Sequence, residues 1–260
     1  MSDARRVLVQ LRSDLKVFVR NPAALFFTAI LPVVFLCLFV AIFGNQSAGP
    51  QFGNVRLATL QVPGFIALAI VSAAFVAPAI GLTSVREAGV LKRVRGTPVA
   101  PWIVFAGRIG TALVSATIVS AILIAIGAAV FGVEVRASTL PGLLITVVLA
   151  VFAFCALGIA YTRAIPSYEA GPAMTNAVVL PLYFISGVLI PASQLPDGML
   201  AFANALPVKA LVDALTVVFD PRTSGAGISA GDLAVLAAWG IGGLLIALRT
   251  FAWTPRLNPG

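Results

Sequence analysis

The sequence predicts an all-α integral membrane protein with six transmembrane helices, an N-terminal amphipathic interfacial helix and an outer re-entrant segment between the fifth and sixth spans. The first observation is composition: of 260 residues, 60% are hydrophobic and only 10% are charged, and the mean hydropathy is +1.06. An average soluble domain carries about 25% charged residues. The chain has too little charge to cover a water-facing surface, which excludes a soluble enzyme, a disordered protein and a collagen-like fibre.

Six charge-poor runs are the second observation, and they mark the spans. A bilayer core needs about 20 helical residues, and five runs without a charged residue are longer than that. The sixth run, 233–248, extends back to 228 with Asp232 close to one end. The first run is too long for the apolar part of a cleaved signal peptide, so we expect it to remain as a helix. The predicted spans are 23–43, 60–83, 103–131, 140–161, 172–191 and 229–249.

The basic residues are the third observation, because they orient the spans. With six crossings both chain ends lie on the same side of the membrane, and the segments on that side hold 13 of the 17 Lys and Arg residues. Cytoplasmic loops carry such an excess of positive charge, so we expect both termini in the cytoplasm. The same rule accounts for the net charge of +8 without a nucleic-acid partner.

Residues 1–22 form the first predicted element, a basic amphipathic helix. At 100° per residue its apolar and basic side chains fall on opposite arcs, as in a helix that lies in the interfacial layer against anionic lipid. Asn21 and Pro22 break it before the first span. A solvated positive leader that only sets the topology is the alternative. The apolar arc contains Val7, Leu8, Leu11, Leu15, Phe18 and Val19, and the basic arc contains Arg5, Arg6, Arg12, Lys16 and Arg20.

The loop between the second and third spans, 84–101, places an apolar ridge beside positive charge. Val90, Leu91 and Val94 fall within about 100° of one another on a short helix, which Thr97-Pro98 and Pro101 would end. Such a loop is suited to dock into a partner's groove, with the flanking arginines making ion pairs. A short positive connector that only obeys the positive-inside rule explains the residues equally well.

The segment 192–228 between the fifth and sixth spans is long for a simple connector. Its apolar residues from 208 to 219 share one helical arc, while Lys209 and Asp213 are i,i+4 neighbours on another. Prolines break the chain around this helix, as in a re-entrant hairpin buried against protein. An outer gate and an interfacial cap that only seals the bundle both fit this pattern. The gate candidates are Pro181, Gly187, Pro191, Pro196, Pro207, Lys209 and Asp213.

Several groups that carry chemistry are missing from the sequence. The chain has no His, Cys37 and Cys155 lie inside apolar runs, and none of the three lysines completes a P-loop. No catalytic constellation, metal site or cofactor site is predicted, so we do not expect an enzyme. The span cores lack Asp and Glu, which argues against a proton relay. If ATP drives this protein, another chain must hydrolyse it.

Three motifs, in order along this six-helix frame, resemble the ABC-2 family of ABC-transporter permeases. The pattern R-E-x-G-V-L-K-R-x-R-x-T-P at 86–98 is similar to the family's cytoplasmic loop, and Arg20-Asn21-Pro22 leads into the first span as in the family. The stretch 180–191, followed by 194–196 and 204–207, resembles the family's fifth span and its re-entrant turn. The closest resemblance is to the bacterial branch that exports drugs and lipids.

The resemblance implies a half-transporter of the bacterial cell membrane. Residues 23–260 would be the transmembrane domain, 1–22 its connecting helix, and 84–101 a coupling loop held by a cytoplasmic P-loop ATPase that binds ATP and Mg. Two permease subunits, as a homodimer or with a paralogue, would form the path for a lipid, drug or other amphipathic substrate. The implied coupling residues are Arg86, Glu87, Gly89, Val90, Leu91, Lys92, Arg93, Val94, Arg95, Thr97 and Pro98.

Two other functions remain as alternatives. A proton-driven multidrug efflux protein has the same composition, although such exporters need carboxylates or histidines within their spans. The ABC-2 family also includes polysaccharide exporters, whose paths differ from those for amphipathic substrates.

Overall fold

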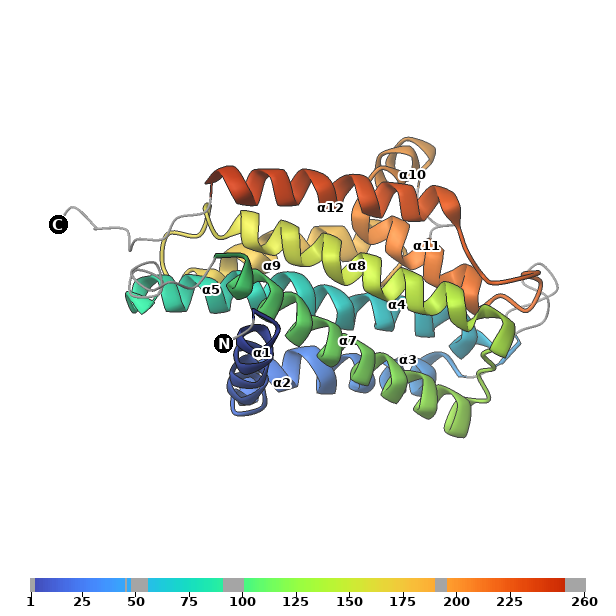
Figure 1. The fold of residues 1–260 in the computed structure, drawn as a ribbon. Helices are drawn as coiled ribbons and strands as arrows, with labels where there is room; N and C mark the ends of the chain where they lie inside the picture. Colours follow the sequence, from blue (N-terminus) through green and yellow to red (C-terminus); the bar gives the residue numbers. More distant parts are fainter. Residues whose placement is uncertain (1–2, 45, 48–55, 91–100, 190–195, 251–260) are drawn as a thin grey trace.

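A computed structural model of the chain describes residues 3–44, 46–47, 56–90, 101–189 and 196–250 (Figure 1). These ranges form a helical bundle without a strand, so the predicted all-α membrane fold is confirmed. The helices are α1 (Asp3–Val19), α2 (Pro22–Leu25), η1 (Phe26–Ile30), α3 (Leu31–Phe43), α4 (Leu57–Val71), η3 (Ser72–Val76), α5 (Ala77–Glu87), α7 (Pro101–Phe131), η4 (Ala137–Thr139), α8 (Leu140–Tyr161), α9 (Gly171–Ile185), α10 (Asp197–Asn204), α11 (Pro207–Phe219) and α12 (Ala230–Thr250).

Among the described residues, five helices are long and apolar enough to cross a bilayer, or six if the bent pair α10–α11 is taken as one span, and the five coincide with the first, second, third, fourth and sixth predicted spans. The fifth predicted span, 172–191, begins where it was expected, but α9 has only 15 residues and ends at Ile185. Gly187 explains the early end, because its φ of 86° lies in the left-handed region that commonly follows a helix C-terminus. The five long helices are Pro22–Phe43, Leu57–Glu87, Phe105–Phe131, Ala137–Tyr161 and Ala230–Thr250.

Helices α10 and α11 form a bent pair, with an angle of 89° between them. Ten of the 13 residues of α11 are buried, and the helix packs against α4, α8 and α12. Trp239, near the middle of α12, donates a 2.8 Å hydrogen bond from its indole N–H to the carbonyl of Ala205. The bend therefore lies beside the middle of α12, and α11 is buried within the bundle.

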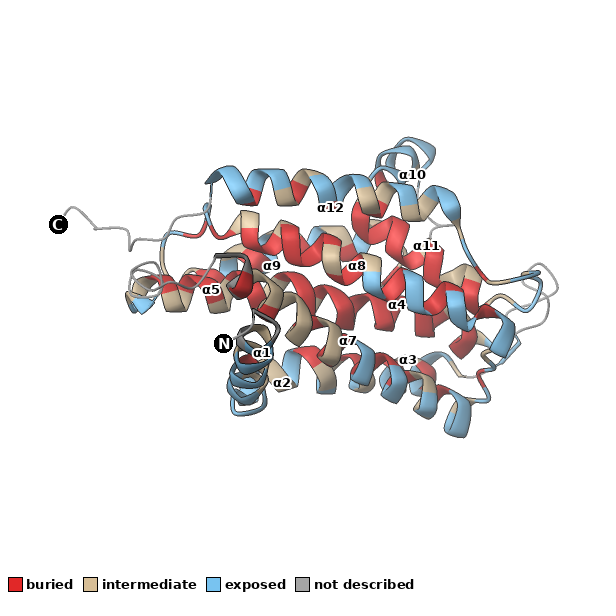
Figure 2. Cartoon of the chain, viewed as in Figure 1, coloured by how far each residue is buried: buried red, intermediate tan, exposed pale blue. Residues whose placement is uncertain are grey.

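The second and fourth spans form the centre of the bundle. In the most apolar part of Leu57–Glu87, 72% of the residues are buried, against 22% in the first and last spans. Figure 2 shows buried residues along α4 and α11, whereas α3, α7 and α12 each present an exposed face. Those exposed faces carry large apolar side chains, as a surface in contact with lipid requires.

Two π-helical turns occur in the spans just before prolines. η1 precedes Pro32, and η3 precedes Pro78. A proline inside a helix has no N–H, and its ring crowds the carbonyl four residues earlier. That carbonyl belongs to Thr28 in the first case and Ala74 in the second, both within the π turn. The wider turn accommodates the ring, so the span continues without a break.

Two glycines bring α12 close to α8. A Cβ added at Gly240 would lie 3.1 Å from the Cα of Ala153, and one added at Gly243 would lie 2.9 Å from the backbone nitrogen of Leu157. Small residues allow transmembrane helices to approach this closely and gain van der Waals contact. Gly242, directly before Gly243 in the helix, faces open space.

We expect Gly243→Ala to destabilise the protein by about 1–3 kcal/mol, because the new methyl group would push α12 away from the α8 backbone. The matched variant Gly242→Ala has room for its methyl group. It should be neutral or stabilise the helix by up to about 1 kcal/mol. Thermal unfolding of both purified variants in one detergent measures the difference, and an equal loss of stability in both would contradict it.

Candidate functional site

Three arginine side chains donate hydrogen bonds to backbone carbonyls at the C-terminal ends of three helices. The last carbonyls of a helix have no partner within it and carry partial negative charge, so a guanidinium satisfies both their hydrogen bonding and their charge. The need for such donors is greatest within a membrane, where an unpaired backbone carbonyl costs several kcal/mol. The contacts are Arg56 Nη1 to Phe131 O at the end of α7 (2.9 Å), Arg86 Nη1 to Thr162 O after α8 (2.9 Å) and Arg136 Nη2 to Asp220 O after α11 (2.8 Å).

Arg86 lies at the end of α5 and is the most deeply buried of the three. It is only 2% exposed, and its second terminal nitrogen, Nη2, donates to Ile165 O at 2.9 Å. The planar guanidinium can bridge two carbonyls, which a lysine ammonium cannot do in the same fixed geometry. Arg86 therefore holds the segment 162–170, which joins α8 to α9, against the end of α5.

Glu87 adds a second contact between the same two segments. Its Oε2 accepts a 3.0 Å hydrogen bond from the backbone N–H of Tyr168. At the start of the segment, the Tyr161 hydroxyl donates to Met174 O on α9, at 3.0 Å. The residues after α5 and the residues before α9 are consequently tied together at one end of the bundle. We call this end, formed by α1, the segment 162–170 and the C-terminal ends of α5, α8 and α12, the basic end.

Helix α1 lies across the basic end, beside α2 and α7 (Figure 1). Its Asp14 is 6% exposed, accepts a 3.1 Å hydrogen bond from Gln10 Nε2 and lies 3.8 Å from Nε of Arg108 on α7. Glycine at position 107 makes the contact possible, because an added Cβ there would lie 2.5 Å from Gln10 Cγ. Asn21 then caps the first span by accepting from the Ala24 N–H at 3.1 Å.

The apolar and basic arcs predicted for α1 include neither Gln10 nor Asp14, so the sequence analysis did not predict the contact with Arg108. Gln10 and Asp14 follow the i, i+4 spacing of Val7, Leu11, Leu15 and Phe18, and these six residues form the face turned toward the bundle. Their spacing is the signal that could have identified them. Leu8 and Val19, which the sequence places on the apolar arc, are 63% and 62% exposed. They are therefore left on the face that a membrane surface would contact.

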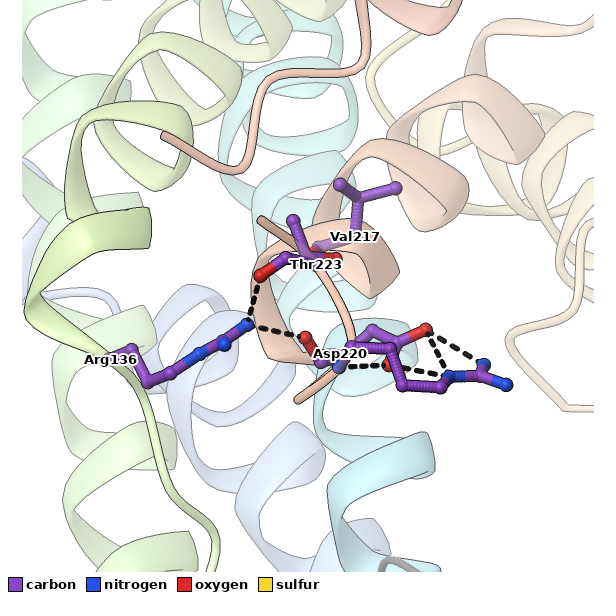
Figure 3. A network of polar contacts seen from close by, with 5 residues as sticks. Arg136, Val217, Asp220 and Thr223 are labelled. Atoms are coloured by element: carbon purple, nitrogen blue, oxygen red, sulfur yellow. Dashed lines mark hydrogen bonds and ion pairs between the residues drawn. The ribbon is translucent and has the colours of Figure 1, made fainter. Parts of the chain in front are cut away.

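The opposite end of the bundle has its own polar network (Figure 3). The Arg136 guanidinium also reaches Thr223 O at 2.7 Å, and the Thr223 hydroxyl donates to Val217 O at 2.7 Å. The Asp220 carboxylate accepts from the backbone N–H of Arg222 and from its guanidinium, both at 2.8 Å. Hydrogen bonds from Arg222 hold the pKa of the Asp220 carboxyl below its usual value. Together these contacts fix the turn that follows α11.

The gate candidates lie on or around α9, α10 and α11. Pro181 is inside α9, Gly187 follows it, Pro196 precedes α10 and Pro207 begins α11, whereas Pro191 lies outside the described residues. Lys209 and Asp213 form the predicted i,i+4 ion pair on α11. Lys209 is only 5% exposed. The sequence places this pair in an outer segment that is read as a re-entrant hairpin. In the structure the pair lies on α11, which packs against α4, α8 and α12, and the Asp213 side chain is 36% exposed.

An apolar cavity of about 500 Å³ lies between α8, α9 and α12, in the half of the bundle nearer the basic end. One end of its lining is the α10–α11 bend with Trp239, and the other end contains Arg163, Ala164 and Thr250. Trp239 is 39% exposed and Ile246 is 52% exposed, so the cavity is open along α12. The remaining lining comes from Val71, Phe75, Phe154, Leu157, Ala160, Tyr161, Val178, Val179, Leu182, Leu206, Pro207, Val208 and Ile246.

Comparison with protein families matches residues 5–219 to the ABC-2 type transporter family. The chain belongs to this family. The match runs from residue 5 in α1 to the end of α11, and it includes α5, α8, the segment 162–170 and the bent pair α10–α11. A comparison with curated protein sequences finds no match. An ABC-2 membrane domain is the permease part of a transporter that works with an ATP-binding subunit, so this is a multi-pass membrane permease.

In the ABC-2 permease, the predicted coupling loop falls into two parts. Glu87, Gly89 and Val90 lie at the surface or near it, and the Val90 side chain is 41% exposed. Arg86 instead lies inside the protein, away from any surface that a partner would contact. Residues 91–100, and with them the remaining coupling candidates, are outside the described ranges: Leu91, Lys92, Arg93, Val94, Arg95, Thr97 and Pro98.

We expect Arg86→Met to release the segment 162–170 from α5. The methionine keeps the apolar stem but loses the hydrogen bonds to Thr162 O and Ile165 O, each worth about 1.5–3 kcal/mol with a charged donor. Amide hydrogen exchange in 162–170 should therefore quicken by roughly tenfold or more. Arg20→Gln, an exposed arginine at the same end, is the control. Unchanged exchange in 162–170 would refute the assigned contact.

The turn after α11 should loosen as the pH falls. Because the folded-state pKa of Asp220 is lowered, its contacts contribute stability that is present above the unfolded pKa, about 3.9. That contribution is lost as the pH falls below this value and through the folded pKa. Amide exchange in 220–223 should rise on acidification, and Asp220→Asn should abolish this dependence. A persisting dependence in that variant would assign the titration to another group.

Proposed function

We propose that this permease is the membrane subunit of an ATP-driven exporter for a lipid, drug or other amphipathic substrate. The segment 84–101 would bind a cytoplasmic P-loop ATPase, which binds ATP and Mg, while the permease itself has no catalytic or cofactor site. A second permease subunit, identical or paralogous, would complete the path. The setting is the bacterial cell membrane, with the basic end and both termini in the cytoplasm.

The observation that carries this proposal is the pair of contacts made by Arg86 and Glu87. These residues begin the proposed coupling segment, and both bind the segment 162–170. That segment leads directly into α9 and contributes Arg163 and Ala164 to the cavity. A displacement imposed on 84–101 by an ATPase would therefore reach α9 and the cavity through direct contacts, without a flexible linker between them.

The cavity supports an amphipathic substrate class. Its lining consists almost entirely of aliphatic and aromatic side chains, and a site of this kind favours ligands with a large apolar part. A hydrated polysaccharide would leave its hydroxyl groups without partners along such a wall. This weighs against the polysaccharide-exporting alternative.

Proton-driven efflux is kept as the second candidate because of the Lys209–Asp213 pair. An ionisable pair inside a membrane bundle is a functional-site hypothesis by default. The two functions separate in one assay: transport into vesicles is measured with ATP held constant while a protonophore collapses the proton gradient. Loss of transport under these conditions would favour the antiporter, and continued transport the ATP-driven exporter.

We expect Val90→Asp, and the equivalent change at Leu91, to uncouple the permease from its ATPase. Each places a charge on the apolar ridge proposed to enter the ATPase groove, where an unpaired buried charge costs several kcal/mol. Substrate-stimulated ATP hydrolysis and co-purification of the ATPase should both fall by tenfold or more, while thermal unfolding of the permease stays the same.

Ala88→Asp is the matched control for this experiment. It adds the same charge at an exposed position two residues before Val90, off the predicted ridge. Coupling should survive in this variant. Normal ATPase binding and full transport in the Val90→Asp and Leu91→Asp variants would contradict the assignment of 84–101 as the docking segment.

A further inference from the structure

Tyr161, the last residue of α8, contacts three parts of the molecule at once. Its hydroxyl donates a 3.0 Å hydrogen bond to Met174 O on α9. Its ring packs on Phe75 of η3, with 5.5 Å between the ring centroids and 37° between the ring planes. The next residue along the chain supplies a carbonyl that Arg86 binds. Tyr161 therefore lies where the segment 162–170, the second span and α9 meet.

The second span fixes the position of the Tyr161 ring. Gly158, about one turn earlier in α8, allows the two spans to approach, because an added Cβ there would lie 2.7 Å from Phe75 O. Phe75 is itself only 7% exposed, and both rings form part of the wall of the apolar cavity. A packed aromatic pair keeps the tyrosine ring in one place, so its hydroxyl meets α9 at a fixed point.

Helix α9 has a narrow buried face, which makes its hydrogen bonds to other spans important. Its buried residues recur every fourth position, and an element with few buried contacts opens easily. Tyrosine hydroxyls tie it down towards both ends: Tyr161 binds Met174 O near its beginning, and Tyr183 donates to Leu68 O, at 3.3 Å, near its end. The buried residues of α9 are Gly171, Thr175, Val179 and Tyr183.

We propose that Tyr161 is a positioning residue that carries ATPase-driven motion of the segment 162–170 into α9. The inference rests on the proposed function, in which an ATPase displaces 84–101 and with it Arg86. The hydrogen bond from Tyr161 to Met174 joins the residues on either side of the segment, so the segment and the beginning of α9 move as one unit. Without that bond, the turn between them would bend and absorb the displacement.

Tyr161→Phe tests the contact in the purified permease. The variant keeps the ring that packs on Phe75 and loses only the hydroxyl. Amide hydrogen exchange at the beginning of α9, in 171–177, should quicken about threefold to tenfold, the effect of one neutral hydrogen bond. Unchanged exchange there would refute the role of the hydroxyl.

The chain has two further tyrosines, which supply matched controls. Tyr168→Phe removes the same group from an exposed side chain of the segment 162–170, and Tyr183→Phe removes it towards the far end of α9. Neither change should alter exchange in 171–177. An equal response to all three changes would mean that α9 loosens as a whole, and would contradict the proposal.

A double variant tests whether Tyr161 transmits motion. Arg86→Met releases the segment 162–170 and should also quicken exchange in 171–177. In the double variant with Tyr161→Phe, exchange in 162–170 should still respond to Arg86→Met, whereas exchange in 171–177 should be the same as in Tyr161→Phe alone. Coupled residues show such non-additivity. Additive effects in 171–177 would overturn the proposal.

The last experiment adds the ATPase and compares exchange with and without ATP trapped by vanadate. In the wild-type complex, ATP should change exchange in both 162–170 and 171–177. In Tyr161→Phe the change in 162–170 should remain and the change in 171–177 should be lost, whereas Tyr168→Phe and Tyr183→Phe keep both. A response to ATP in 171–177 of Tyr161→Phe equal to that of the wild type would refute transmission through Tyr161. No response to ATP in the wild-type 162–170 would instead contradict the proposed function, and the double variant of the permease alone would still decide the role of Tyr161.

Discussion

The backbone at helix ends is the constraint on which the rest of this structure depends. Helices satisfy their own backbone groups except at their ends, where N–H groups of the first turn and carbonyls of the last turn remain unpaired. Arg56, Arg86 and Arg136 supply the missing donors, each from a different part of the chain. Every such bond also joins two segments far apart in sequence, so the contacts that satisfy the helix ends also determine how the loops are held.

Arg86 illustrates how one residue can serve both structure and function. Its burial is stable because its guanidinium binds two carbonyls. The same contacts join the proposed coupling segment to the entrance of α9 and to the apolar cavity. Two features of this permease that look separate in the sequence, a positive loop and an apolar cavity, are therefore parts of one connected region at the basic end.

The position of the bent helices α10 and α11 changes where charged residues lie in the bundle. Judged by sequence, the six span cores contain no charge, since Lys209 and Asp213 fall between the fifth and sixth spans, in the segment that is read as a re-entrant hairpin. Once α11 enters the bundle beside α4, α8 and α12, the pair lies among the helices. Lys209 can be buried because Asp213 is one turn away and neutralises it.

The sequence by itself determined the class of fold, five of the six spans, the break at Asn21-Pro22 and the transporter family, because hydropathy, helix-breaking residues and motif order are local properties of the chain. It did not reveal that Arg86 turns inward, that Asp14 faces Arg108, or that α9, α8 and α12 enclose an apolar cavity. Each of these depends on segments that are distant in the sequence: 94 residues separate Asp14 from Arg108, and 79 separate Arg86 from Ile165. Only the tertiary structure decides such pairings, because the partner of a charge or a carbonyl is set by packing and not by its neighbours along the chain.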